Sequence, residues 1–336
     1  MHNHRSRVLV LVDRYPETTE TYVKAELEAL ARDHDVTVVS RHAARLPFAN
    51  HPPFRTTNDV NVLREIVEDV RPSVLHTHYL WNAPTLQALA EPLGIPFTVR
   101  AHSCDTMPGC AGESSAHLVE AAAAVRSDLC RGVLTFPFTR PALEQAGIPG
   151  DKLFDCFPVF DFEKFHDESE NGAGVMHVGS CQPKKGMDEF LLVAGRMPSL
   201  RFTLYAIGPR VEMLRRINVI HGHAAQISDP VDPDDMPAVY KQHRWLAYTA
   251  CTKLRSVGWP VAIAEAQAAG VGVCLPRLRP DLEDFVGEGA FLYDTRAELE
   301  AMLAQPVPED MRAAGFAQAR KSDVRGHLPQ LTNLWH

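Results

Sequence analysis

Short apolar runs alternate with helical spacing along most of the chain, and this alternation restricts the fold more than any other feature. Residues 8–12 and 36–40 are apolar runs of strand length, and residues 22–32 between them place apolar side chains at helical spacing. Such a strand–helix–strand unit pairs its strands in parallel through a right-handed crossover. The sequence therefore predicts an α/β fold built on parallel sheets.

The alternation stops once and then restarts. Residues 156–174 are first aromatic, then acidic and glycine-rich, and carry neither a helical nor a strand period, which is typical of a domain linker. Beyond them the pattern resumes, so we expect two Rossmann-like, doubly wound domains facing each other across a cleft. The expected bounds are an N-terminal domain over 1–157, a linker over 158–174, a C-terminal domain over 175–320, and a C-terminal helix in 321–336 that could cross back to the N-terminal domain.

Charges, cysteines and histidines exclude several classes of protein. The 336 residues carry a net charge of −8, and the interspersed acids and bases form no basic face that predicts a nucleic-acid partner. No apolar run approaches the roughly 18 residues of a membrane span. Seven scattered cysteines fit a cytoplasmic chain with reduced thiols. The pairs His76/His78 and His221/His223 lack a second ligand pair, so we expect no metal site.

The stretch 255–277 organises the second half of the chain. A Gly-Trp-Pro turn at 258–260 opens an alanine-rich helix that Gly270 can close, and a buried strand follows at 271–275. Free N–H groups and the positive end of the helix dipole at the turn suit a phosphate or diphosphate. Glu265, about one and a half turns into the helix, could reach sugar hydroxyls beside it. The alternative is a buried crossover helix with one surface acid.

Loops at the carboxyl ends of predicted strands carry the other candidates. The loop 179–186 holds Lys184 and Lys185 at a helix start and could cradle an anion, with solvated surface lysines as the alternative. The loop 15–21 holds two acids and three threonines where doubly wound sheets bind ligands, with helix capping as the alternative.

A histidine and an aspartate follow the strand predicted at 96–100. His102 and Asp105 could form a dyad in which the carboxylate orients the imidazole and raises its pKa. A purely structural pair is the alternative. The position at a carboxyl strand end makes a catalytic or ligand-binding role equally plausible.

Six segments in order resemble the motifs of GT-B glycosyltransferases of family 4, of the exopolysaccharide and lipopolysaccharide type, a group with many bacterial polysaccharide enzymes. They cover most of the chain. They are Tyr15-Pro-Glu-Thr-Thr-Glu20-Thr21 (family F-P-x-x-S-E-T-F), His102-Ser-Cys-Asp105 (H-G-x-D), Pro158-Val-Phe-Asp161 with Phe165 (P-N-G-V-D…F), Val178-Gly-Ser-Cys-Gln-Pro-Lys-Lys185-Gly186 (V-G-R-L…K-K-G), Gly258-Trp-Pro with Glu265-Ala-Gln-Ala-Ala-Gly270 (E-G-F-G…E-A-M-A-x-G), and Glu283 (G-G-x-x-E).

The resemblance implies transfer of a sugar from a nucleotide-sugar donor, held mainly by the second domain, to a glycan or lipid-linked acceptor in the first. It also implies that the transfer retains the anomeric configuration and that the reaction needs neither a metal nor a cofactor. Lys185 would neutralise the donor diphosphate, Glu265 would bind ribose hydroxyls, and His102 would sit over the sugar. The implied catalytic set is His102, Asp105 and Glu20. The implied donor-binding set is Gly179, Ser180, Lys185, Arg255, Gly258, Trp259, Pro260, Glu265 and Glu283.

Two positions depart from the family pattern. Val257 stands where the family has the first glutamate of E-x7-E, and Ser180 stands where it has a phosphate-binding arginine. An arginine–diphosphate contact in a dry site stabilises the leaving group by several kcal/mol. Its loss could be offset by Lys253, Arg255 or Arg277, which are near the turn in sequence.

Two other functions stay open at this point. The chain could be a transferase-like scaffold that binds a nucleotide or a partner without catalysis, or a GT-B sugar-nucleotide epimerase with Glu20, Asp105 and Glu265 as its acids. Peripheral contact with a membrane also stays open, because many relatives act on lipid-linked acceptors, although no basic amphipathic helix supports it. The sequence does not indicate an oligomeric state.

Overall fold

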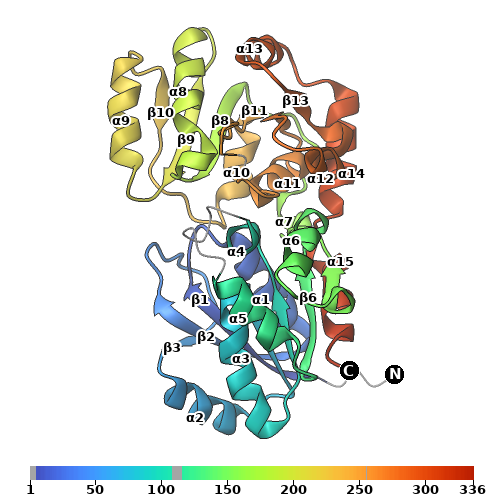
Figure 1. The fold of residues 1–336 in the computed structure, drawn as a ribbon. Helices are drawn as coiled ribbons and strands as arrows, with labels where there is room; N and C mark the ends of the chain where they lie inside the picture. Colours follow the sequence, from blue (N-terminus) through green and yellow to red (C-terminus); the bar gives the residue numbers. More distant parts are fainter. Residues whose placement is uncertain (1–4, 108–115, 255) are drawn as a thin grey trace. The chain divides into compact units, whose positions relative to one another are not determined.

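The computed structural model describes residues 5–107, 116–254 and 256–336 (Figure 1). The chain forms two compact units. Unit 1 comprises Met1–Val159 and Val324–His336, and unit 2 comprises Phe160–Asp323. Among the helices of the described residues, none combines the length and apolar character needed to cross a membrane.

Unit 1 is built on a seven-stranded sheet of order β3-β2-β1-β4-β5-β6-β7. Every neighbouring pair in it is parallel. Its strands are β1 (Arg7–Tyr15), β2 (Asp35–Ala43), β3 (Phe54–Thr56), β4 (Val74–His78), β5 (Phe97–Arg100), β6 (Cys130–Thr135) and β7 (Leu153–Asp155). Its helices are α1 (Thr21–Asp33), α2 (Val60–Val70), α3 (Ala83–Ala90), α4 (Ser103–Thr106), α5 (Ala116–Val125), α6 (Arg140–Gln145) and α15 (Val324–Asn333).

The core of unit 1 lies between the sheet and its covering helices. Leu9, Leu75 and Val99 on adjacent strands pack with Leu86 of α3 and Ala122 of α5 in one buried cluster, and α3 and α5 lie side by side in Figure 1. Strand β4 is buried at every position, as expected for a central parallel strand covered on both faces.

Unit 2 repeats the design with a six-stranded parallel sheet of order β10-β9-β8-β11-β12-β13. Its strands are β8 (Gly174–Ser180), β9 (Phe202–Ile207), β10 (Ala225–Ile227), β11 (His243–Ala247), β12 (Gly272–Pro276) and β13 (Phe291–Tyr293). Its helices are α7 (Phe162–Phe165), α8 (Met187–Arg196), α9 (Val211–Ile220), α10 (Met236–Lys241), α11 (Val261–Ala268), α12 (Asp281–Val286), α13 (Arg296–Leu303) and α14 (Glu309–Arg320). The predicted α/β, doubly wound, parallel architecture is confirmed in both units.

Each sheet has one topological switch point, where successive strands start to be added on the opposite side. It lies between β1 and β4 in unit 1 and between β8 and β11 in unit 2. The loops that follow these strands diverge to opposite faces, so ligands of doubly wound folds bind at the carboxyl ends of the strands there. The fold therefore singles out one edge position in each unit.

Several elements differ from the sequence predictions. The stretch expected to be an irregular linker contains the short helix α7, which Asp161 caps by accepting a hydrogen bond from the Lys164 backbone N–H. The three-residue edge strands β3, β7, β10 and β13 were not predicted, because so few residues carry too little period to detect. Helices α4, α9, α12 and α13 were not predicted either. At the C-terminus, α15 packs against α1 within unit 1.

Candidate functional site

The loop after β8 in unit 2 is shaped by two glycines with positive φ. Gly179 has φ +139°, and a β-carbon there would lie 2.5 Å from Nζ of Lys185. Gly186 has φ +56°, and a β-carbon there would lie 2.0 Å from the carbonyl oxygen of Thr249. Thr249 follows β11 and donates its hydroxyl to the Gly186 carbonyl at 2.7 Å. The two sides of the switch point are thus in direct contact, and only glycine leaves room for this packing.

Lys185 places its ammonium group at this switch point. Nζ lies 5.5 Å from the ring centroid of Tyr248, which stacks in turn on His177. Burial lowers the pKa of Lys185 to about 8, and the nearby negative charge of Glu265 acts in the opposite direction. Lys185 forms no ion pair within the described part of the chain. A cation that is partly desolvated without a paired anion is well suited to bind an anionic ligand.

Glu265 lies inside α11 rather than on the surface. Its side chain is 6% exposed, and its Oε2 accepts a hydrogen bond of 2.8 Å from the Tyr240 hydroxyl. The alternative of a surface acid is therefore wrong. A buried carboxylate close to the Lys185 ammonium offers acceptor oxygens to hydroxyl groups of a ligand.

The Trp259 side chain in the Gly-Trp-Pro turn does not face a ligand site as expected. Trp259 is 5% exposed, its ring stacks on Phe285 at 5.1 Å, and its Nε1 donates to Asp281 at 2.9 Å. The indole is part of the core, so this turn can offer a ligand only backbone groups. Pro260 is the N-cap residue of α11, so the turn opens the helix as predicted.

The remaining donor-binding candidates vary in their surroundings. Ser180 accepts a hydrogen bond of 3.1 Å from Gln182. Glu283 is exposed on α12 and forms an ion pair with Arg277, whose Nε also lies 3.6 Å from Asp294. Arg277 is thus already paired with acids and is a poor replacement for the missing arginine. Arg255 lies outside the described residues.

The predicted dyad of unit 1 does not form. The Asp105 carboxylate accepts the backbone N–H of His102 at 2.7 Å and that of Leu80 at 2.6 Å. It therefore caps the short helix α4 and contacts the backbone of His102 instead of orienting its imidazole. Burial raises the pKa of Asp105 to about 7, against the lowering effect of these hydrogen bonds.

The His102 imidazole instead faces a second histidine. Its Nε2 lies 3.0 Å from Nδ1 of His78 at the end of β4, and the side chain is 8% exposed. Burial, together with the charges of neighbouring His78 and Arg100, holds the pKa of His102 well below its usual range. The expectation that an acid raises this pKa is therefore wrong, because Nε2 of the ring faces an imidazole and not a carboxylate.

Glu20 lies at the switch point of unit 1 and contacts an aromatic cluster. Burial raises the pKa of Glu20 to about 8, against a hydrogen bond from Tyr79, and its Oε2 has no hydrogen-bond partner among the described residues. The Tyr79 and Tyr22 hydroxyls are 2.5 Å apart, and both rings lie within 5 Å of the His102 ring. The structure thus brings Glu20 and His102 together through two tyrosines.

Tyr79 has an uncommon backbone conformation for a tyrosine. Its φ is +76° and its ring stacks on half-buried Trp81 at 4.4 Å. Strained backbone of this kind persists where the surroundings fix it, and it clusters at functional sites. This conformation could not be predicted from the sequence, because backbone strain has no local sequence pattern.

Sequence reasoning missed several further residues at the two switch points. They are Tyr22, Glu26, Tyr79 and Arg100 in unit 1, and His177, Tyr240 and Tyr248 in unit 2. The sequence contained one signal for some of these residues. His76 and His78 are two residues apart in a strand, so they share one face of the sheet, and donor atoms of Glu26, His76 and His78 lie within 4.8 Å of one another.

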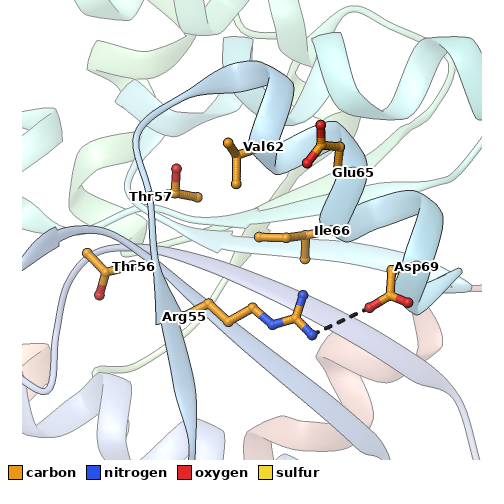
Figure 2. A pocket seen from close by; sticks show the side chains of 7 residues that line it. All are labelled: Arg55, Thr56, Thr57, Val62, Glu65, Ile66 and Asp69. Carbon is orange, nitrogen blue, oxygen red and sulfur yellow. Dashed lines mark hydrogen bonds and ion pairs between the residues drawn. The ribbon is translucent and has the colours of Figure 1, made fainter.

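A pocket of about 370 Å³ lies away from these residues, beside β3 and α2 in unit 1 (Figure 2). Figure 2 shows the Arg55 side chain extending towards Asp69. The two side chains form an ion pair at 3.4 Å. None of the predicted site residues lines it. Because Arg55 and Asp69 are paired with each other and all the charged groups that line this pocket are exposed, we assign the site to the switch points.

The comparisons with known proteins agree on the fold. No protein-family model and no curated protein matches the chain. Among solved structures, HepE from Anabaena in complex with UDP and glucose has a TM-score of 0.76 at 16% identity, covering 98% of this chain and 99% of that one. Sucrose-phosphate synthase from Thermosynechococcus elongatus has a TM-score of 0.73 at 16% identity, covering 97% and 98%.

A third similar structure is the apo form of the lipopolysaccharide outer core galactosyltransferase WaaB, with a TM-score of 0.64 at 9% identity, covering 98% of each chain. These neighbours are GT-B glycosyltransferases. At such identities the likeness shows the fold alone. Two parallel, doubly wound sheets with full-length coverage give this chain the GT-B fold class.

Proposed function

We propose that this protein is a glycosyltransferase that transfers a sugar from a nucleotide-sugar donor to a glycan or lipid-linked acceptor. The observation that carries the proposal is the partly desolvated Lys185 ammonium at the switch point of unit 2, with the buried Glu265 carboxylate nearby. A cation beside a hydroxyl-binding acid matches the two chemical parts of a nucleoside diphosphate. Similar structures contain UDP, or UDP with glucose.

The proposed mechanism follows from the charge that develops in the reaction. Departure of a nucleoside diphosphate leaves an oxocarbenium-like sugar and adds negative charge to the phosphates. Lys185 and the N-terminal N–H groups of α11 stabilise that charge with fixed groups, without a metal. Glu265 accepts hydrogen bonds from ribose hydroxyls. The resemblance to family 4 supports retention of configuration.

Unit 1 supplies the acceptor side in this proposal. Glu20, with its unpartnered Oε2, is a hydrogen-bonding group for a hydroxyl-rich ligand. His102 contributes its fixed geometry rather than proton transfer, because its ring is buried against His78. Asp105 shapes the loop through the backbone. Polysaccharide or lipopolysaccharide synthesis in a bacterial cytoplasm is the matching role, including contact with lipid-linked acceptors at the inner membrane face.

The test is a donor panel with a matched pair of lysine variants. We expect one nucleotide sugar to be hydrolysed or transferred, and Lys185→Ala to lower kcat by about 10²–10³-fold. Lys184→Ala, a neighbouring lysine outside the Gly179 contact, is the control and retains activity. Turnover by Lys185→Ala at the wild-type rate would show that the donor diphosphate does not bind at this switch point.

A scaffold function is the second candidate, and one observation favours it. Ser180 replaces the expected arginine, and its hydroxyl accepts from Gln182, so this position supplies no cation. Stabilisation of the fold by nucleoside diphosphates, without turnover of any donor in the presence of acceptor extracts, would decide for the scaffold.

A further inference from the structure

A continuous chain of polar side chains runs behind His102 in the core of unit 1. Glu26 on α1 is fully buried and has both oxygens engaged. Its Oε2 accepts from Nε of Arg100 at 2.6 Å, and its Oε1 lies 2.9 Å from Nε2 of His76 and 3.2 Å from Nε2 of His78. His78 then meets His102 through its other ring nitrogen, at 3.0 Å.

The proton positions along this chain follow from the acceptor at its end. The Arg100 guanidinium and both histidines outweigh burial and hold the pKa of Glu26 well below its usual range, so Glu26 is an ionised carboxylate that can only accept. His78 Nε2 lies 3.2 Å from the anionic Oε1 of Glu26 and forms no hydrogen bond within the described residues, and a lone pair on it would be repelled by the carboxylate. That nitrogen therefore carries the proton of the neutral His78 ring.

The order of donors is then fixed up to His102. With Nε2 of His78 protonated, its Nδ1 has a lone pair and can only accept. The partner atom, Nε2 of His102, must donate. An acceptor on the far side of one imidazole thus selects the tautomer of the next one.

We propose that Glu26 and His78 are positioning residues that hold the His102 imidazole as its neutral Nε2–H tautomer, in one orientation, at the carboxyl end of β5. The tautomer stands on the geometry of unit 1, whereas the consequence for turnover rests on the proposed function. Neither Glu26 nor His78 contacts solvent, so both act through His102. This network of side chains explains why the ionisable groups of Glu26, His78 and His102 are kept in the core at these positions.

A divalent metal ion is the competing explanation for Glu26, His76 and His78, whose donor atoms cluster closely enough to hold one. The Arg100 guanidinium argues against it. It already neutralises Glu26 through two nitrogens, Nε at 2.6 Å and Nη2 at 2.5 Å, and an ion would add two positive charges beside it. His76 also bonds Thr98 through its other nitrogen, at 2.8 Å, so the cluster is balanced by hydrogen bonds alone.

The first arm of the test is spectroscopic and needs no activity. In a long-range ¹H–¹⁵N NMR spectrum of wild-type protein labelled at histidine, the His102 signals are assigned by their loss in His102→Gln. We expect a single neutral Nε2–H tautomer, unchanged after dialysis against a chelator. A Nδ1–H form, or an average of both tautomers, overturns the proposal, and a chelator-dependent change overturns it in favour of the metal.

The second arm uses His78 variants and a nucleotide-sugar turnover assay. His78→Leu removes the acceptor, and we expect kcat to fall about tenfold to a hundredfold, as for a misplaced catalytic geometry, with the donor KM within about twofold. His78→Gln keeps one donor and one acceptor at a similar separation and is expected to restore most of the loss and the tautomer.

The two arms separate the possible failures. If no donor is turned over by the wild type, the proposed function fails and the tautomer is still decided by the spectrum. If His78→Leu does not fold, the wild-type spectrum and His78→Gln carry the test. Wild-type kcat in His78→Leu, or equal losses in the Leu and Gln variants, would refute the positioning role.

Discussion

The ammonium of Lys185 lies 2.5 Å from the position that a β-carbon on residue 179 would occupy. Gly179 and Lys185 are therefore a matched pair: the absent side chain of one makes room for the charge of the other. The contact joins the end of β8 to the loop before α8, at the switch point of unit 2. It yields the first prediction.

Gly179→Ala is expected to displace Lys185 and to weaken binding of UDP or a related nucleoside diphosphate, measured by calorimetry. Gly208→Ala is the control, because Gly208 also has a positive φ, +115°, but a β-carbon there meets nothing closer than 4.0 Å. Both variants lose about 1–3 kcal/mol of stability from backbone strain. Equal nucleotide affinity in the two variants would contradict the Lys185 contact.

The second prediction concerns the pH dependence of nucleotide binding. Burial lowers the pKa of Lys185 to about 8, so its positive charge is present below that pH and is lost as the pH rises through it. We expect the Kd for a nucleoside diphosphate to rise between pH 7 and pH 9, values set on either side of the lowered pKa. Lys185→Arg keeps its charge over this range and should flatten the profile. A profile with the same slope in both proteins would assign the effect elsewhere.

A third prediction tests the hydrogen bond between Tyr240 and Glu265. Tyr240→Phe removes the donor from a buried carboxylate, which is expected to cost about 1.5–3 kcal/mol of unfolding free energy. In Glu265→Gln the same substitution should cost less, because the charge is gone. Denaturant titrations of the two single variants and the double variant measure the coupling, and a coupling near zero would show that the bond contributes nothing.

The buried pair of Glu26 and Arg100 gives a fourth prediction. Glu26→Gln leaves the guanidinium without its counterion in the core of unit 1, and we expect a loss of about 3–5 kcal/mol. Asp69→Asn breaks the exposed pair with Arg55 and is expected to change stability by less than about 1 kcal/mol. Similar denaturant midpoints for the two variants would mean that burial does not decide the strength of these pairs.

The fifth prediction follows from the raised pKa of Glu20. The pKa of Glu20 is raised from the ordinary glutamate value of 4.5 to about 8 in the folded chain, so the folded state binds this proton more tightly. The contribution of Glu20 to stability therefore falls as the pH rises from the lower value to the higher one. Glu20→Gln removes this loss, so its Tm should exceed that of the wild type more at pH 8 than at pH 5. A difference independent of pH would show that Glu20 is ionised in the fold.

The local pattern of the chain was enough to predict the architecture. Buried parallel strands are apolar throughout and helices repeat every 3.6 residues, so the strands predicted at 8–12 and 36–40 and the helix predicted at 22–32 lie within the observed β1, β2 and α1. Three-residue edge strands such as β3 and the short helix α7 escaped, because so few residues show no period. Sequence spacing also predicted that Lys185 lies in a loop at a helix start and that Glu265 lies within a helix.

The partners of these residues were decided only by the tertiary structure. Asp105 is close to His102 in sequence, yet it caps a backbone, whereas the imidazole of His102 meets His78, which lies 24 positions earlier. Tyr240 reaches Glu265 across 25 positions. Hydrogen bonds between side chains depend on which strands are adjacent and which rotamers fit the core. The sequence determined two parallel sheets and their loops by local periodicity, and the packing of those sheets alone decided which side chains meet.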